Sequence, residues 1–206
     1  MGIALHKKKT SHSTLMTEGS IWKHILFFSI PLILGNMLQQ LYNTVDSIVV
    51  GNFLGSEALA AVGSSSSLIM LLISFSMGAA AGAGVIVSQF IGAQNKKGIH
   101  ESVHTALAIA LILGVVLTAA GLILSPQILR WMGTPEEVMP QSITYLRLYF
   151  AGVIFSILYN MASGILNAVG NSKRALLYLA IASFTNIILD LLFIPVLKMG
   201  IAGAAI

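Results

Sequence analysis

The sequence contains no cysteine and very little charge. Of its 206 residues, 9% are charged and 56% are hydrophobic, whereas a typical soluble domain has about 25% charged residues. Without cysteine, the chain can hold neither a disulfide framework nor a thiolate-ligated metal. The scarcity of charge and the long apolar runs exclude an ordinary soluble domain. They indicate an all-α, polytopic transmembrane helix bundle surrounded by a lipid bilayer.

Motifs for catalysis and for cofactors are missing as well. The sequence has no phosphate-binding loop and no nucleophile elbow. His100 and His104 have i, i+4 spacing, but no third metal ligand accompanies them. The net charge of +4 comes from basic residues in short segments between apolar runs, which is the positive-inside pattern of membrane proteins. We therefore expect no enzyme activity, no cofactor, no structural metal and no nucleic-acid partner.

Apolar runs divide the chain into about six spans. We expect a cytoplasmic tail over residues 1–20 and one transmembrane lobe over residues 21–206. The expected spans cover residues 21–50, 58–91, 105–124, 143–169 and 175–197, and a sixth begins at residue 201. Residues 92–104 and 125–140 are expected to be polar connections. Within the second span, Gly78 and Gly82 have the small-xxx-small spacing that favours close helix packing.

Lysine and arginine are distributed unequally between the two ends of these spans. Three basic residues fall at the far ends, namely Arg130, Arg147 and Lys198. The other eight fall on the side where the chain starts, namely Lys7, Lys8, Lys9, Lys23, Lys96, Lys97, Lys173 and Arg174. This asymmetry predicts a cytoplasmic N-terminus.

The first span carries many polar side chains for a segment that enters a bilayer. At about 100° per residue, four of them fall on one side of a helix: Asn36, Gln40, Asn43 and Ser47. This stripe cannot face lipid, so we expect it to line a cavity. Pro31 in the same span removes a backbone hydrogen bond and predicts a kink. The kink is either a packing feature or a hinge that bends between transport states.

A second polar stripe follows one face of the fourth span. Its members recur every three or four residues and are also expected to line a cavity: Ser156, Asn160, Ser163 and Asn167.

Two of the seven acidic residues lie within predicted spans, Asp46 in the first and Asp190 in the fifth. A charged group near the bilayer centre costs about 2.5–3.5 kcal/mol, and no basic residue inside a span neutralises these two. Both spans run outward and both acids lie past the middle, so we expect them to face one cavity at similar depth. Asn186 lies one turn before Asp190 and on the same helix face. These oxygen atoms could bind Na⁺, or the carboxylates could take up and release a proton. Alternatively, each aspartate is structural and bonds to backbone or to a neighbouring asparagine.

Several segments, taken in order, resemble the multidrug and toxic compound extrusion (MATE) family over about residues 15–206. The first span contributes PLILGNMLQQLYNTVDSIVVGNFLG, and the second opens with LAAVG and closes with SQFIGAQN. The fourth contributes YLRLYFAGVIFSILYNMASGILNAVGNSK and the fifth contributes NIILD. The order and spacing of these segments carry the resemblance.

The resemblance implies twelve helices in two six-helix lobes. This sequence would supply the N-terminal lobe, and the C-terminal lobe would be absent from it. The family resemblance also implies export of drugs or toxic organic compounds, small and amphipathic or cationic, across the plasma (inner) membrane of a prokaryote in exchange for Na⁺ or H⁺. A cation site of the family matches Asp46, Asn186 and Asp190, and Pro31 resembles a first-helix proline proposed to couple bending to protonation.

Two alternatives remain open from the sequence. A flippase for lipid-linked saccharides or cell-wall precursors shares the broad architecture, but would be expected to carry basic residues inside its spans. This sequence has only Arg147, near a span end. The second alternative is a truncated membrane protein that does not transport.

Overall fold

The computed structural model describes residues 20–205 and contains helices but no strand in that range. The helices are α1 (Ile21–Leu54), α2 (Ser56–Gly92), α3 (Lys96–Trp131), α4 (Met139–Ala168), α5 (Ser172–Phe193) and the short α6 (Ile201–Ala205). Helices α1 to α5 are long and apolar enough to cross a membrane. The predicted all-α transmembrane bundle is therefore confirmed. The predicted tail lies outside the described residues, except for Ser20.

Several helices extend beyond the spans expected from the sequence. Helix α3 begins at Lys96 and ends at Trp131, whereas the expected span covers residues 105–124. Its start is fixed by Asn95, whose side chain accepts a hydrogen bond from the Gly98 backbone N–H at 3.0 Å. Much of the two expected polar connections is consequently helical, and the first of them shortens to residues 93–95. Hydropathy marks the part of a helix that suits lipid, whereas the cap marks where the helix begins.

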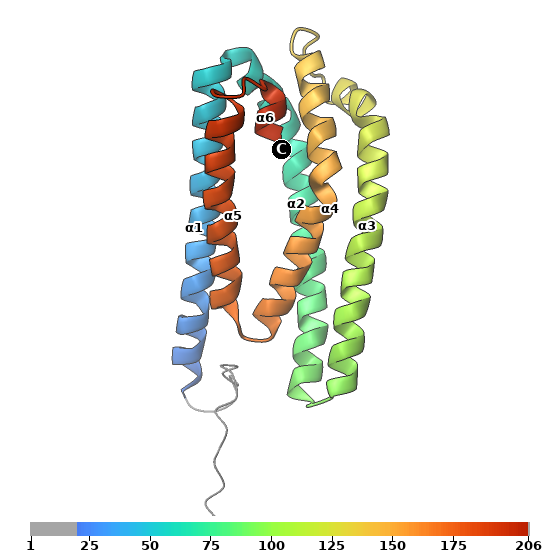
Figure 1. The fold of residues 1–206 in the computed structure, drawn as a ribbon. Helices are drawn as coiled ribbons and strands as arrows, with labels where there is room; N and C mark the ends of the chain where they lie inside the picture. The colour runs from blue at the N-terminus through green and yellow to red at the C-terminus, as the bar shows by residue number, and fades with distance from the viewer. Residues whose placement is uncertain (1–19, 206) are drawn as a thin grey trace, which may run out of the picture.

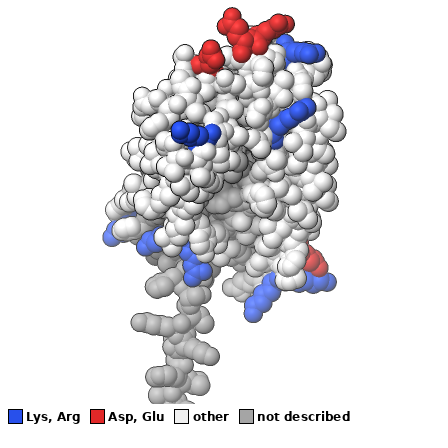
Figure 2. Space-filling model, turned by 45° about the horizontal axis from the view of Figure 1, so that its top comes forward, with Lys and Arg blue, Asp and Glu red and all other residues white. Residues whose placement is uncertain are grey.

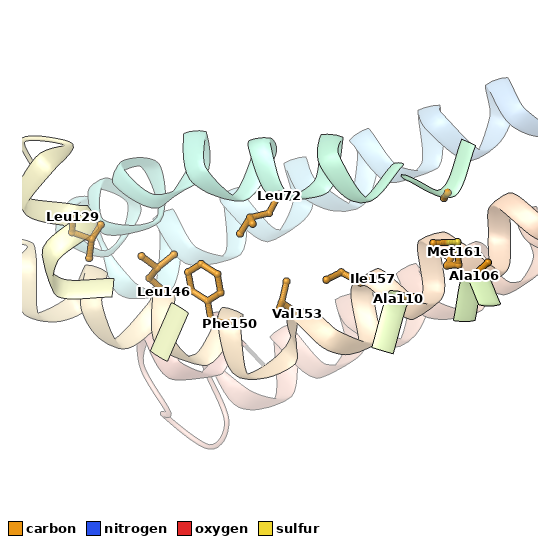
Figure 3. Close-up of a cluster of buried hydrophobic side chains, with 10 residues drawn as sticks. Leu72, Ala106, Ala110, Leu129, Leu146, Phe150, Val153, Ile157 and Met161 are labelled. Atoms are coloured by element: carbon orange, nitrogen blue, oxygen red, sulfur yellow. The ribbon is translucent and has the colours of Figure 1, made fainter. Parts of the chain in front are cut away.

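The long helices form two groups (Figure 1). Helices α2, α3 and α4 pack closely on one another, and α1 packs mainly on α5. Helix α6 lies at the far end of the bundle between the groups and contacts α1, α4 and α5. The larger apolar core belongs to the first group and runs along the bundle from Leu129 to Met161 (Figure 3).

Helix α3 contains a proline whose structural cost is offset by a neighbouring helix. Pro126 lacks an N–H, so the carbonyl of Leu122 four residues earlier loses its usual helical partner. Arg147 of α4 donates to that carbonyl through Nε at 3.2 Å. This interhelical hydrogen bond explains how α3 continues through the proline.

Helices α2 and α4 come closest where small residues face each other. A Cβ added at Gly164 would lie 2.7 Å from the Ala80 carbonyl oxygen, and one at Gly84 would lie 3.2 Å from the Gly164 oxygen. The sequence prediction placed close packing at Gly78 and Gly82, but a Cβ at either would meet nothing within 4 Å among the described residues. The spacing was correct, but the contact lies two residues further along the helix.

Gly164→Ala is expected to destabilise the protein by about 1–3 kcal/mol, because the new methyl group would push backbone against backbone. Gly152→Ala in the same helix is the matched control, since its Cβ would meet nothing within 4 Å. The control should be neutral or stabilise by about 0.5–1 kcal/mol, because alanine favours helix. Thermal unfolding of the full-length protein in detergent measures both. Equal unfolding temperatures for the two variants would contradict the proposed α2–α4 contact.

Candidate site of paired carboxylates

Helices α1 and α5 run side by side in the same direction, which sets the heights of the two acids (Figure 1). Near the start of both helices, the Ser172 hydroxyl donates to the Phe28 carbonyl at 3.4 Å, between residues 144 positions apart. The same separation of 144 positions holds between Asp46 and Asp190. Two parallel helices with equal rise per residue keep such pairs at one height. The register therefore brings the two carboxylates to one level of the bundle.

The oxygen atoms at this level are buried and lack partners. Asp190 is 3% exposed, and Asp46 and Asn186 are half-buried. Asp46 Oδ1, Asn186 Oδ1 and Asp190 Oδ2 have no hydrogen-bond partner among the described residues. The hydroxyl of Ser183, two turns before Asp190 on the same face, also has none. Leaving one such buried group unsatisfied costs about 1–3 kcal/mol, so this concentration of acceptors favours a binding role over a purely structural one.

The charges around the pair are unbalanced. Asp46 and Asp190 lie at one height on helices that pack together, so their charges repel each other when both are ionised, and the buried Tyr145 of α4 lies near both. Within residues 20–205, the ion pair that forms is Lys97–Glu101, which includes neither aspartate. No cluster of three His, Cys, Asp or Glu side chains that could hold a metal occurs in that range. The chemistry therefore suits a hard monovalent cation or a proton held by carboxylate, amide and hydroxyl oxygens.

An apolar layer covers the pair toward the far end of the bundle. Val49, Val50 and Ile194 are at most 5% exposed, and they pack with Ala58 of α2. Val49 lies one turn after Asp46, and Ile194 lies one turn after Asp190. The layer limits access of water from that end, which strengthens the electrostatic interactions beneath it.

The second polar stripe lies at a separate cavity of about 640 Å³ between α1, α2 and α4. Asn160, Ser163 and Asn167 line it, and Asn167 Oδ1 is buried without a partner among the described residues. Ser156 does not line this cavity; its carbonyl accepts a hydrogen bond from Asn160 Nδ2 at 2.9 Å. Helix α2 adds Gln89 to the polar lining.

The polar stripe of α1 does not line that cavity. Within the part of the chain that the structure describes, no other segment covers the four side chains, which are exposed: Asn36, Gln40, Asn43 and Ser47. The Ser47 hydroxyl donates to the Asn43 carbonyl at 2.9 Å, which satisfies it within its own helix. The two stripes are therefore not brought together by this lobe. Pro31 is buried, and α1 continues through it.

The sequence places Ser183 on the same helix face as Asn186 and Asp190, and its hydroxyl lies among the unpartnered groups here. Sequence reasoning missed one group near the paired carboxylates, Tyr145. The stripe of α4 continues backward from Ser156 at helical spacing through Gly152 and Tyr149 to Tyr145. Extending the stripe by about three turns would have found the tyrosine.

Comparisons with known proteins point to one family of membrane proteins. The sequence pattern of the MatE family matches residues 31–192. The probable multidrug resistance protein YpnP of Bacillus subtilis is 39% identical over 189 residues, which are 92% of this chain and 42% of YpnP. The probable multidrug resistance protein YoeA of the same organism is 37% identical over 199 residues, which are 95% of this chain and 42% of YoeA.

A solved MOP superfamily transporter from Pyrococcus furiosus has the same fold. It matches with a TM-score of 0.89 and 35% identity over 96% of this chain and 44% of its own. The chain thus spans less than half the length of the relatives it matches. Since the family pattern covers most of the chain and the fold agrees with a solved relative, the chain belongs to the MatE family, as segments of its first, second, fourth and fifth spans predicted.

Proposed function

We propose that the protein carrying this chain is a secondary antiporter. It would export drugs or toxic organic compounds, small and often cationic, in exchange for Na⁺ or H⁺. The observation that carries this proposal is the pair Asp46 and Asp190, which lie at one height with oxygen atoms that lack hydrogen-bond partners. Among residues 20–205, neither acid forms an ion pair with a basic side chain. The similarity to YpnP and YoeA, both probable multidrug resistance proteins, supports the substrate class.

Coupling would arise from the repulsion between the two carboxylates. Binding of Na⁺ or a proton would relieve that repulsion and favour conformations in which α1 and α5 stay close together. Release of the cation would favour conformations in which the acids separate or become hydrated. A ligand shifts such an equilibrium by its difference in affinity for the two states. We place the flexible point of α1 at Pro31, one turn after the Phe28 carbonyl that α5 contacts.

The substrate would use surfaces that this lobe leaves polar but uncharged. The cavity lined by Asn160, Ser163 and Asn167 offers amide and hydroxyl groups beside apolar walls, as an amphipathic compound requires. The exposed stripe of α1 would face the C-terminal lobe, which the family resemblance implies and this chain does not contain. The central pathway would then lie between the two lobes.

The distribution of charge supports a cytoplasmic N-terminus, and the similarity to proteins of Bacillus subtilis supports a prokaryotic inner membrane. Charged side chains collect at the two ends of the bundle, and the surface between them is largely uncharged (Figure 2). The starting end carries Lys96, Lys97, Lys173 and Arg174 among its exposed residues. The positive-inside tendency assigns that end to the cytoplasm.

A flippase for anionic lipid-linked saccharides receives less support. Its cargo would require free basic groups within the spans. Arg147 is the candidate, but it lies toward the far end of the bundle and donates its Nε–H to the Leu122 carbonyl. Its hydrogen bond beside Pro126 favours a structural role.

Replacing either acid should abolish coupled transport. Asp46→Asn and Asp190→Asn keep the side-chain size but remove the charge that attracts a cation. In the full-length protein, each should reduce gradient-driven ethidium efflux from cells by at least about tenfold, the equivalent of about 1.4 kcal/mol. Glu57→Gln, an exposed acid in the first turn of α2, should leave efflux unchanged. Normal efflux by both aspartate variants at equal expression would exclude this site.

Cation binding should also stabilise the purified protein. A ligand present at about 100 times its Kd adds about 2.7 kcal/mol to the free energy of unfolding. Unfolding temperatures in detergent, with NaCl against KCl and across pH 5 to 8, test this. Stabilisation specific to Na⁺ identifies Na⁺ as the coupling ion, and acid stabilisation independent of Na⁺ identifies the proton. Either response should disappear in the Asp46→Asn variant, and a protein unaffected by both would contradict cation binding.

A further inference from the structure

A second hollow lies on the bundle at the opposite end from the paired carboxylates. This groove of about 360 Å³ lies between α2 and α3, with α4 behind it. Its apolar and small residues are Ala83 and Ile86 of α2, Ala106 and Ile109 of α3, and Met161 of α4. Its polar residues all come from the first turns of α3 and are Glu101, Ser102 and Thr105.

The groove changes from polar to apolar along α3, as a bilayer changes from headgroups to acyl chains. Glu101 lies in the second turn of α3, and Ile109 lies about 12 Å deeper at 1.5 Å per residue. The floor is closed, because Ala106 is 6% exposed and Met161 is 3% exposed. The walls are open, because Ile86 is 50% exposed and Ile109 is 47% exposed. A lipid with its headgroup at the rim and an acyl chain along the floor matches this order.

The rim offers one cation and one anion to a headgroup. Lys97 Nζ lies 3.8 Å from Glu101 Oε1, with side chains 86% and 64% exposed. An ion pair this long and this exposed contributes little to stability. Each side chain can therefore leave the other and bind a ligand instead. Lys97 complements a phosphate and Glu101 complements an ammonium group. Phosphatidylethanolamine carries both groups, whereas phosphatidylglycerol carries only the phosphate and would meet Glu101 with no cation to offer.

We propose that this groove is a binding site for phosphatidylethanolamine. One acyl chain lies over Ala106 and Met161, the phosphate lies at Lys97, and the ammonium group lies at Glu101. The site does not depend on the proposed transport function, because it shares no residue with the paired carboxylates or with the larger cavity. It also gives α3, which packs mainly on α4 and α2, a lipid partner on its open side.

Native mass spectrometry of the full-length protein tests the proposal, with dioleoyl phosphatidylethanolamine and dioleoyl phosphatidylglycerol as probes of equal chain length. The wild-type protein should retain the ethanolamine lipid about tenfold better, which corresponds to about 1.4 kcal/mol. Thr105→Trp, an exposed groove position, should fill the groove and remove this retention. Ala108→Trp is the matched control, since Ala108 is exposed on α3 outside the groove.

Charge variants test the headgroup separately. Glu101→Gln should lower retention of the ethanolamine lipid to the level of the glycerol lipid, because the ammonium group loses its partner. Lys173→Gln, an exposed lysine of α5 near the same end of the bundle, should change neither lipid. These substitutions involve exposed side chains, so the headgroup test does not depend on whether Thr105→Trp folds.

Three results would overturn the proposal. The first is equal retention of the two lipids by the wild-type protein. The second is identical behaviour of Thr105→Trp and Ala108→Trp. The third is a fall in the unfolding temperature of Thr105→Trp with unchanged lipid retention, which would mean that another protein segment covers the groove.

Discussion

The structure depends on two carboxylates of like charge held at one height inside a membrane-spanning bundle. Burial of such groups is costly unless a cation or a proton joins them. The parallel register of α1 and α5 sets their common height, and the layer of Val49, Val50 and Ile194 covers them on one side. Tyr145 approaches from α4. We propose that a bound cation or proton compensates this charge.

The two helix groups differ in how they are held together, and this difference matters for function. Helices α2, α3 and α4 share the large apolar core, the close approach of Ala80 to Gly164, and the Arg147 hydrogen bond beside Pro126. Helices α1 and α5 hold the acids, and α1 contains a buried proline. We infer that the first group serves as the frame and that α1 and α5 respond to the cation. A change at the acids can then alter the shape of the lobe without unpacking its core.

Sequence patterns predicted the helical bundle and singled out the two candidate acids, because both depend on chemistry that is local in sequence. Apolar runs must be helices in a bilayer, and Asp46 and Asp190 are conspicuous in such runs. The sequence predicted a similar depth for the two acids, but it did not predict the contact of Ser172 with Phe28 that fixes the register of α1 against α5. It missed Tyr145, because a tyrosine in an apolar helix is common and its position near both acids depends on how the helices pack. It shifted the α2–α4 contact by two residues, because several small-xxx-small pairs overlap in that helix.

We propose that the cation at the paired carboxylates and the substrate favour different conformations of the protein, so that binding of one weakens binding of the other. The most direct measurement follows cation release when ethidium is added to the purified full-length protein, using a pH indicator in weak buffer and a Na⁺-selective electrode. The wild-type protein should release protons or Na⁺ as ethidium binds, and the variant carrying both Asp46→Asn and Asp190→Asn should release neither. Ethidium binding to the wild-type protein without release, or equal release by the double variant, would contradict this proposal.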